Sequence, residues 1–449
     1  MSCIAIKNAT IVTVNERNEV IYDGTVIFEN DRIKYVGKTK NAGELLKNVD
    51  EIIDGNGKIL TPGIVNVHTH VMGNVFRGMT EDGPYDFIYR KCFPMESYLN
   101  EENAYWLSMN GCIETLKFGS VLINDLFHFA SQTARAVDQI GMRAILEHKV
   151  YDVKSLANVQ NMDYSRNYEA GKKRLEENEK LICDWNGKAN GRIHCWVGNH
   201  APDTNSPQLL KEGRDLADKY GVGIHMHVAQ LPNEHNYIRE EYGKTSIEFL
   251  DDLGVLRDDV VCAHLVYASD SDIKIMERTG AKFAHCPVII SKSGHLPKVK
   301  ALLDSKIPMA LGNDWVVMNP WDEMRAAVEM TRIVTTGDET AQNAQRVFRM
   351  MTIDGANLLN MGDDLGSLEV GKKADILVID KNRSNLTPMR DVVETLVYNM
   401  TGNEIEKVII NGETVVKDGT TVNVDEGEVV KMTQKYSEEI WRQGGIWPL

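Results

Sequence analysis

The pattern of hydrophobic and polar positions divides the chain into two β-rich ends and a different middle. Residues 1–60 hold short runs in which apolar and polar residues alternate, separated by Asp, Gly and Asn turns. This period of two is typical of antiparallel strands. The same pattern returns after residue 361. We therefore predict one small β-sandwich domain built from both termini, residues 1–60 and 362–449.

The middle part, residues 61–361, alternates short apolar runs with longer segments of helical periodicity. Residues 207–220 are a clear helix, because Ser206 is a good N-cap, Pro207 suits the first turn and Gly221 ends the pattern. Eight such strand-and-helix units in a row predict an α/β fold, a (β/α)8 barrel of the TIM type. The eight apolar runs are residues 63–70, 120–127, 142–150, 192–200, 222–229, 260–267, 281–287 and 308–314.

Composition limits the partners and the compartment. The 449 residues suffice for one large barrel with a smaller domain. The 50 Lys and Arg against 65 Asp and Glu give a net charge of −15, which argues against nucleic acid or an anionic membrane as the main partner. No apolar stretch approaches the ~18 residues of a membrane span. The seven cysteines are scattered without a CxxC spacing, so we expect no disulfide framework and a cytoplasmic protein.

Histidines and one aspartate stand at the ends of four of the eight runs. The first run ends in His68 and His70, the fifth carries His227, the sixth ends at His264 and the eighth at Asp314. Barrel enzymes place their chemistry at the C-terminal ends of the strands, and residues i and i+2 of a strand point to the same side. These side chains are therefore expected to converge on one mouth of the barrel.

Imidazole and carboxylate together suit a divalent ion. A single buried histidine is usually a packed core residue, and His225, one layer below His227, is interpreted that way. Four strand ends that coincide are a stronger pattern and predict a metal site. We expect one divalent ion per subunit, zinc in the first place, with iron and manganese as alternatives.

At this point the motifs resemble those of a known family. The segments TPGIVNVHTH, HMHVAQ, AHLV, AHCP and LGND are similar, in order and spacing, to the amidohydrolase superfamily. The segments NHAPDTNSPQLL and EEYGKTSIEFL resemble its branch of S-adenosylhomocysteine/methylthioadenosine deaminases and triazine hydrolases. The similarity runs over nearly the whole chain and implies the barrel with a β-sandwich from both termini.

The resemblance implies roles for the residues that match the motifs. His68, His70, His227 and Asp314 would be the ligands of one metal ion. His264 would hold or polarise the attacking water. The fourth run has no lysine that could be carbamylated to bridge two ions, which favours a single metal. The bound ion would lower the pKa of water, and Asp314 would accept the water's proton and pass it to the leaving group.

One catalytic position departs from the branch. Members usually carry a glutamate three residues after the fifth-strand ligand, and this chain has Gln230 there. A carboxamide donates a hydrogen bond but lends no proton. Either the substrate needs no ring protonation, or Asp314 performs both proton transfers, or another acid such as Glu234 or Glu96 replaces the missing one, or turnover is weak.

Four further residues are candidates for substrate contact. Glu96 matches the position that holds ribose hydroxyls in nucleoside deaminases of the branch, and His200 matches a residue that contacts the heterocycle. His148 stands where those enzymes place an arginine, which argues against the amino-acid carboxylate of S-adenosylhomocysteine as a ligand. His128, at the end of the second run, is placed to line the pocket.

These residues predict a metal-dependent hydrolase that removes an amino group from an aromatic or purine-like heterocycle. The first alternative is that the same residues expel chloride or an alkylamine from a triazine-like ring, and Gln230 favours it because chloride leaves without a proton. The second is a metal-binding protein that has lost turnover. We expect a small-molecule heterocyclic substrate and, from the family, a homo-oligomer.

Overall fold

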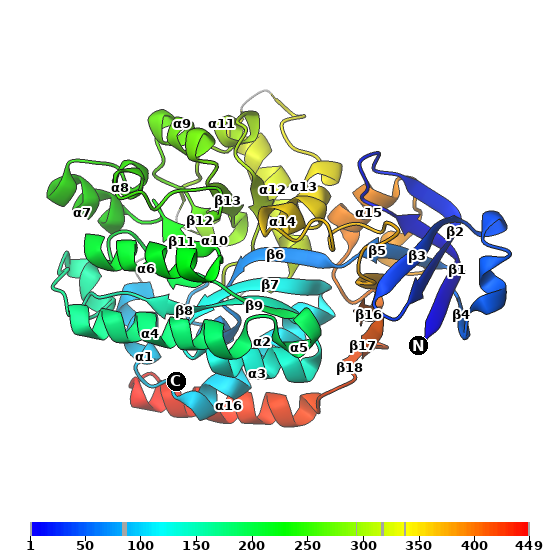
Figure 1. Ribbon diagram of the computed structural model, residues 1–449, viewed down its shortest axis with the longest axis horizontal. Helices are drawn as coiled ribbons and strands as arrows, with labels where there is room; N and C mark the ends of the chain where they lie inside the picture. The colour runs from blue at the N-terminus through cyan, green and yellow to red at the C-terminus, as the bar shows by residue number, and fades with distance from the viewer. Residues whose placement is uncertain (1, 83–87, 293, 316–317, 336–337, 448–449) are drawn as a thin grey trace.

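Eight parallel strand positions form a barrel in the computed structural model, which describes residues 2–82, 88–292, 294–315, 318–335 and 338–447 (Figure 1). The strands neighbour one another in chain order, from β6 round to β14. The barrel closes because Thr69 and Asp314 form a bridge between the last strand position and β6. The barrel strands are β6 (Ile64–Thr69), β7 (Ser120–Phe127), β8 (Arg143–Val150), β9 (Ile193–Cys195) with β10 (Val197–Asn199), β11 (Ile224–Val228), β12 (Val260–His264), β13 (Lys282–His285) and β14 (Met309–Leu311).

Every predicted apolar run contains a barrel strand, and the fourth run holds the pair β9 and β10. The predicted helix 207–220 is α6, where the Ser206 hydroxyl accepts a hydrogen bond from the Leu209 amide and Gly221 ends the helix with a φ of 63°. The predicted barrel is therefore confirmed. The helices of this part are α1 (Phe93–Glu96), α2 (Glu101–Lys117), α3 (Ala130–Ile140), α4 (Tyr168–Trp185), α5 (Lys188–Gly191), α6 (Pro207–Tyr220), α7 (Pro232–Tyr242), α8 (Ser246–Asp252), α9 (Asp270–Thr279), α10 (Pro287–Ser291), α11 (Val299–Asp304), α12 (Pro320–Val334), α13 (Ala344–Met350) and α14 (Ile353–Leu358).

Both termini contribute strands to one mixed sheet beside the barrel (Figure 1). The two ends join where β5 runs antiparallel to β15, with Leu60 opposite Val378. Apolar residues of both ends, among them Ile11, Phe28 and Ile376, pack into one separate core. The strands are β1 (Cys3–Val12), β2 (Val20–Glu29), β3 (Arg32–Lys38), β4 (Glu51–Asp54), β5 (Lys58–Pro62), β15 (Ile376–Asp380), β16 (Ile405–Ile410), β17 (Glu413–Lys417) and β18 (Thr420–Thr421).

The last helix, α16 (Glu426–Gln443), leaves the terminal sheet and lies along α2 of the barrel, whereas α15 (Val392–Asn399) stays between the barrel and the sheet (Figure 1). Lys117 on α2 pairs with Glu426 at 2.8 Å, and the Trp441 indole N–H donates to the Val75 carbonyl at 2.9 Å. Residues 426–443 thus contact the barrel although they follow the terminal strands. The division of the chain at residues 60 and 361 stays a prediction.

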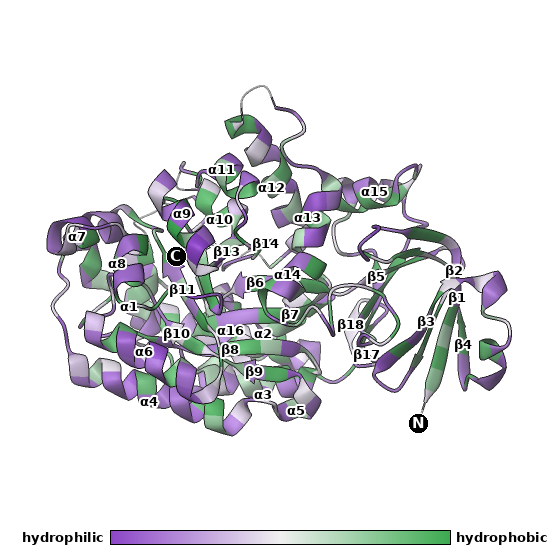
Figure 2. Ribbon diagram, turned by 45° about the horizontal axis from the view of Figure 1, so that its top comes forward, coloured by the Kyte–Doolittle hydropathy of each residue, from purple (hydrophilic) through white to green (hydrophobic). Residues whose placement is uncertain are grey.

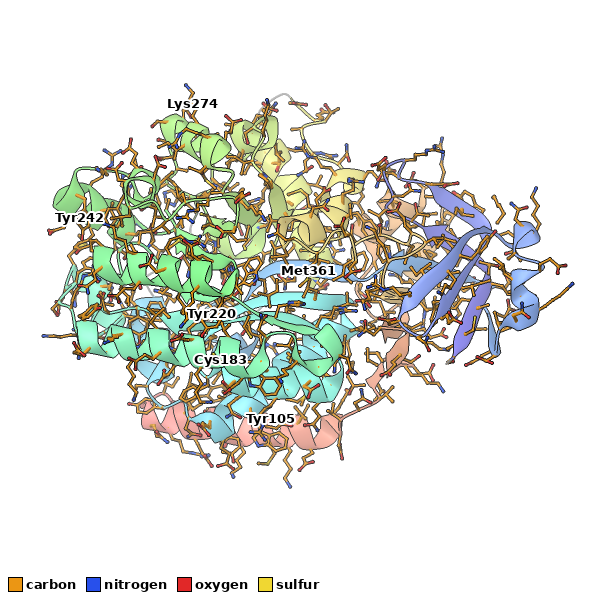
Figure 3. All side chains as sticks on the ribbon, in the orientation of Figure 1. Tyr105, Cys183, Tyr220, Tyr242, Lys274 and Met361 are labelled. Atoms are coloured by element: carbon orange, nitrogen blue, oxygen red, sulfur yellow. The ribbon has the colours of Figure 1, made fainter. Side chains whose placement is uncertain are left out.

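Hydrophobic residues concentrate on the strands, and hydrophilic residues cover the outer helices such as α4 and α6 (Figure 2). Cys183 on α4 and Tyr220 on α6 meet on this outer surface, with the thiol sulfur 3.3 Å from the phenol oxygen (Figure 3). All seven cysteines are free thiols. Among the described residues, no helix combines the length and the apolarity that a bilayer crossing requires.

Candidate metal centre

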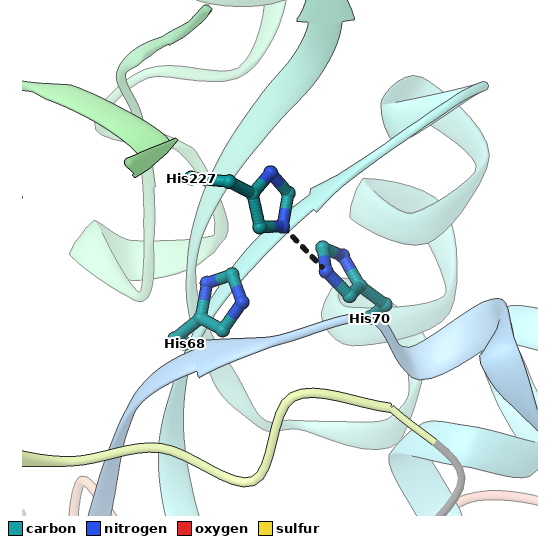
Figure 4. Close-up of side chains that lie close together, drawn as sticks. All are labelled: His68, His70 and His227. Atoms are coloured by element: carbon teal, nitrogen blue, oxygen red, sulfur yellow. Dashed lines mark hydrogen bonds between the residues drawn. The ribbon is translucent and has the colours of Figure 1, made fainter. Parts of the chain in front are cut away.

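Three histidine rings converge above the ends of β6 and β11. His68 on β6 and His70, one residue past the end of that strand, lie on the same side, as their spacing of two predicts, and His227 faces them from β11 (Figure 4). The Nε2 atoms of His70 and His227 lie 3.2 Å apart. Their Nδ1 atoms contact the carbonyl oxygens of Leu126 at 2.6 Å and His200 at 2.8 Å.

These carbonyl contacts determine the protonation of the two rings. A carbonyl oxygen only accepts, so each Nδ1 carries the proton and each Nε2 of the neutral ring carries a lone pair. Two lone pairs that face each other at 3.2 Å repel unless a cation lies between them. The arrangement therefore fits a bound metal ion.

Asp314 and His264 complete the cluster. Asp314 Oδ1 lies 3.3 Å from His70 Nε2 and 3.7 Å from His68 Nε2, while Oδ2 lies 3.6 Å from His264 Nε2. Both residues have left-handed backbones, with φ of 60° at Asp314 and 84° at His264. Such conformations cost roughly 1–3 kcal/mol each for residues other than glycine, and they cluster at functional sites.

The donor set matches the chemistry of zinc. Two overlapping groups, His68 with His70 and His227 and His68 with His264 and Asp314, each bring their ligand atoms within 4.8 Å of one another. His68 Nε2 and both ring nitrogens of His264 are buried without a hydrogen-bond partner. Buried polar atoms are costly to leave unpaired, and three imidazoles with one carboxylate are ordinary ligands of a divalent ion. The structure thus brings together all four predicted ligands, with His264 beside them.

The protonation states of the cluster favour a cation. Burial lowers the pKa of His264 to about 3 and that of His227 well below its ordinary value, so both rings are neutral. Burial acts to raise the pKa of Asp314, but the surrounding rings of His68, His70 and His264 outweigh it and hold that pKa below its ordinary value. Neutral imidazoles and an ionised carboxylate are the forms that bind metal.

A chain of hydrogen bonds lies behind His68. His68 Nδ1 is 2.8 Å from His225 Nε2, and His225 Nδ1 is 3.2 Å from Glu147 Oε2. All three side chains are fully buried. His225 was expected to be plain core packing, whereas here it connects a candidate ligand to a buried acid. We call Glu147, His225 and His68 the relay.

A cavity of about 50 Å³ opens beside the candidate ligands. Aromatic rings of Tyr89, Phe93 and Phe127 form part of its wall. Of the predicted catalytic and substrate-contact residues, those that line it are Glu96, His200, Gln230 and Asp314.

Glu96 is held by two partners at one side of this cavity. Lys149 Nζ lies 2.9 and 3.0 Å from its two carboxylate oxygens, and His128 Nε2 lies 3.0 Å from Oε2. Burial favours the neutral acid, but the charge of Lys149 and the hydrogen bond from His128 lower the pKa of Glu96 to about 2. Burial lowers the pKa of His128 to about 4, so a neutral His128 donates its N–H.

His128 and His148 do not line the cavity among the described residues. His128 acts on it through Glu96, whereas His148 contacts Glu177 of α4 at 3.0 Å. Sequence reasoning missed Lys149. The alternation of side chains along β8 could have revealed it, because residues 147 and 149 point to one side of the strand and residue 148 points to the other.

Gln230 stands on a loop that Glu234 holds in place. Glu234 accepts hydrogen bonds from the amides of Ala229 and Gln230 at 2.6 and 2.8 Å and from the Ser246 hydroxyl at 2.6 Å. Burial, then the charge of Asp203, raises the pKa of Glu234 to about 8. Its oxygens are thus committed to the backbone, and Glu96 is committed to Lys149. Both acids line the cavity, and both already hold these partners.

The sequence pattern of the Amidohydrolase family matches residues 59–415. The chain is 33% identical to the 5'-deoxyadenosine deaminase of Methanosarcina mazei over 448 residues, 98% of this chain and 99% of the relative. It is 32% identical to the 5-methylthioadenosine/S-adenosylhomocysteine deaminase of Caldanaerobacter subterraneus over 448 residues, again 98% and 99%.

Solved structures share the fold at lower identity. An adenosine deaminase from Xanthomonas campestris with bound zinc superposes with a TM-score of 0.89 at 23% identity and covers 98% of both chains. The atrazine chlorohydrolase of Arthrobacter aurescens TC1, complexed with zinc, gives 0.86 at 20% identity, covering 97% of this chain and 100% of its own. The comparisons confirm the predicted resemblance and the predicted class, a hydrolase of the deaminase type that acts on C–N bonds.

Proposed function

The chain belongs to the amidohydrolase family, and we propose that it is a metal-dependent aminohydrolase that replaces the amino group of a purine-like or other heteroaromatic ring by a carbonyl. The observation that carries this proposal is the opposed pair of lone pairs on His70 and His227, with Asp314 3.3 Å from His70, at the wall of a cavity. The deaminase names of the curated relatives support the same reaction.

The metal, when bound, would lower the pKa of water so that it attacks at neutral pH. We propose one zinc ion per subunit, held by His68, His70, His227 and Asp314. Asp314 then accepts the proton of the attacking water and delivers it to the leaving amino nitrogen. His264, neutral and 3.6 Å from Asp314, holds the water by a ring nitrogen and stabilises the developing negative charge.

Gln230 donates an amide N–H to a ring acceptor and lends no proton. Since the oxygens of Glu234 and Glu96 already accept hydrogen bonds from the backbone and from Lys149, we propose that Asp314 performs both proton transfers. Gln230→Glu should then change the rate of deamination by less than about tenfold, and Gln230→Leu should raise KM by removing the donor. A rise of about 10²-fold or more in Gln230→Glu would show that deamination gains from an acid at this position that the native chain lacks. It would contradict the assignment of both proton transfers to Asp314.

An assay of the zinc-loaded protein tests the function directly. Metal analysis gives the ion per subunit, and a screen of heteroaromatic amines measures released ammonia. Ammonia release supports the deaminase. Chloride or alkylamine release from chlorinated or alkylated triazines would instead support the alternative that Gln230 favours, since chloride needs no proton to leave. Tight ligand binding without product would point to a binding protein. We also propose that the protein is a homo-oligomer and is located in the cytoplasm. Light scattering tests the oligomeric state.

A further inference from the structure

We propose that Lys149, through its ion pair with Glu96, determines substrate specificity by restricting the cavity to a small, uncharged heteroaromatic ring without a sugar. The inference rests on the proposed function for the reacting amine, but it concerns a different part of the site. The relatives are named as deaminases of nucleosides, so it also separates this chain from them.

The ion pair is part of the cavity wall and is closed to solvent. Lys149 and Glu96 both line the cavity, and their side chains are only 4% and 6% exposed. The ammonium group also lies 4.7 Å from the centroid of the Phe93 ring and 5.3 Å from that of Phe127, within the range of a cation–π contact. A charged pair held by two rings and a histidine is fixed in place rather than free to turn toward a ligand.

The hydrogen-bond capacity of Glu96 argues against a sugar. A carboxylate offers about four acceptor sites. Three of them are used by the two contacts with Lys149 and the one with His128. One site remains, which is too few for the two neighbouring hydroxyls of a ribose. Lys149 has three N–H donors and spends two on Glu96, so one remains for an acceptor atom of a heteroaromatic ring.

The charge and the shape of the cavity also favour an uncharged, planar ligand. Lys149 and Glu96 neutralise each other, so this side of the cavity presents a dipole and favours an uncharged ligand. The aromatic walls suit a planar ring.

Matched pairs of free base and nucleoside test the proposal on the zinc-loaded protein. Adenine is compared with adenosine and 5'-deoxyadenosine, guanine with guanosine, and cytosine with cytidine, by ammonia release and by calorimetric binding. We expect at least one base to exceed its nucleoside by on the order of tenfold or more in kcat/KM or in affinity. A preference for the nucleoside in every pair that reacts or binds, or no binding of any base, overturns the inference.

A different result would contradict the proposed deaminase function. It fails if no amine in the screen releases ammonia from the zinc-loaded protein, whichever compound binds. The inference is then decided by the calorimetric preference alone, so the two failures are distinguishable.

Variants assign the effect to the ion pair. Lys149→Met keeps the aliphatic stem and frees Glu96, so the ratio of base to nucleoside should fall by about tenfold or more. The double variant Lys149→Met with Glu96→Gln avoids an unpaired buried charge. Its carboxamide N–H groups can donate to the hydroxyl oxygens of a ribose, so the ratio should also fall, but by less than in the single variant. Lys282→Met is the control, because Lys282 is a buried lysine that bonds to the Leu358 carbonyl and to Asn360, outside the cavity. It should lower stability and leave the ratio unchanged. An unchanged ratio in both Lys149 variants contradicts the proposal.

Discussion

The relay behind His68 gives a prediction about metal affinity. For His68 Nε2 to bind a metal, its Nδ1 must carry the proton and donate to His225 Nε2, 2.8 Å away. His225 must then carry its own proton on Nδ1 and donate it to Glu147 Oε2 at 3.2 Å. Glu147 is therefore the acceptor that sets both tautomers. Glu147→Leu removes it and leaves a buried N–H without a partner.

The expected size of the effect follows from this geometry. Outer partners of metal-bound histidines are worth about 10–100-fold in metal affinity, or roughly 1.4–2.8 kcal/mol. The His225 N–H without a partner costs a similar ~1–3 kcal/mol. His225 avoids this cost by moving its proton to Nε2, and His68 must then carry its own proton on Nε2, the atom that would bind the metal. We therefore expect the zinc dissociation constant of Glu147→Leu to rise by about 10–100-fold. Glu147→Gln keeps an oxygen acceptor and should bind zinc nearly as the wild type does.

Competition with a chromophoric chelator at pH 7 measures the dissociation constant, and the absorption spectrum of the cobalt-loaded protein reports the ligand geometry. Glu404→Leu is the control, since Glu404 is a buried carboxylate that accepts from Asn385 at 2.7 Å near the terminal sheet. It should destabilise the fold without changing zinc affinity. Wild-type zinc affinity and an unchanged cobalt spectrum in a folded Glu147→Leu protein would show that Glu147 does not support His68 as a metal ligand.

Three further predictions follow from the same structure. Asp314→Asn should lower kcat by about 10²–10⁴-fold at saturating zinc, because an amide accepts no proton in the transfer that we propose; steady-state kinetics with metal analysis tests this. Folding lowers the pKa of Glu96 from 4.5 to about 2, so its carboxylate adds about 3 kcal/mol of stability above pH 4.5. This stability is lost as the pH falls toward 2. Urea unfolding at pH 5 and pH 2.5 measures the loss, which Glu96→Gln should lack. Gly312→Ala should cost about 1–3 kcal/mol, because its Cβ would lie 2.8 Å from His68, whereas Gly43→Ala meets no atom within 4 Å and should leave the melting temperature unchanged.

Much of this architecture could be predicted from local sequence. Strand parity alone placed His68 and His70 on one side of β6, and the rule that barrel chemistry lies at strand ends brought in His227, His264 and Asp314. These are short-range patterns, so a single sequence carries them. The left-handed backbones at His264 and Asp314 have no such signature, because neither residue is a glycine and the conformation is imposed by tertiary contacts.

The pocket was harder to predict because its partners are distant in sequence. Glu96 and Lys149 are 53 positions apart, and nothing local to Glu96 shows that its charge is already satisfied. The family comparison drew attention to His148, the residue aligned with an arginine, although β8 parity turns that side chain toward Glu177 of α4. In the same way, the docking of α16 on α2 depends on contacts such as Lys117 with Glu426, which no periodicity reveals.

The two inward residues of β8 explain how this fold separates metal binding from substrate choice. Glu147 supports His68 through His225, and Lys149, two residues further along the strand, holds Glu96 at the cavity. Because the spacing of two keeps both on one side of the strand while His148 points to a helix, they occupy successive layers with different neighbours. A substitution at Lys149 can therefore change the ligand while the relay stays intact, and a substitution at Glu147 can weaken the metal while the cavity keeps its shape. One strand of the barrel thus carries two independently variable functions.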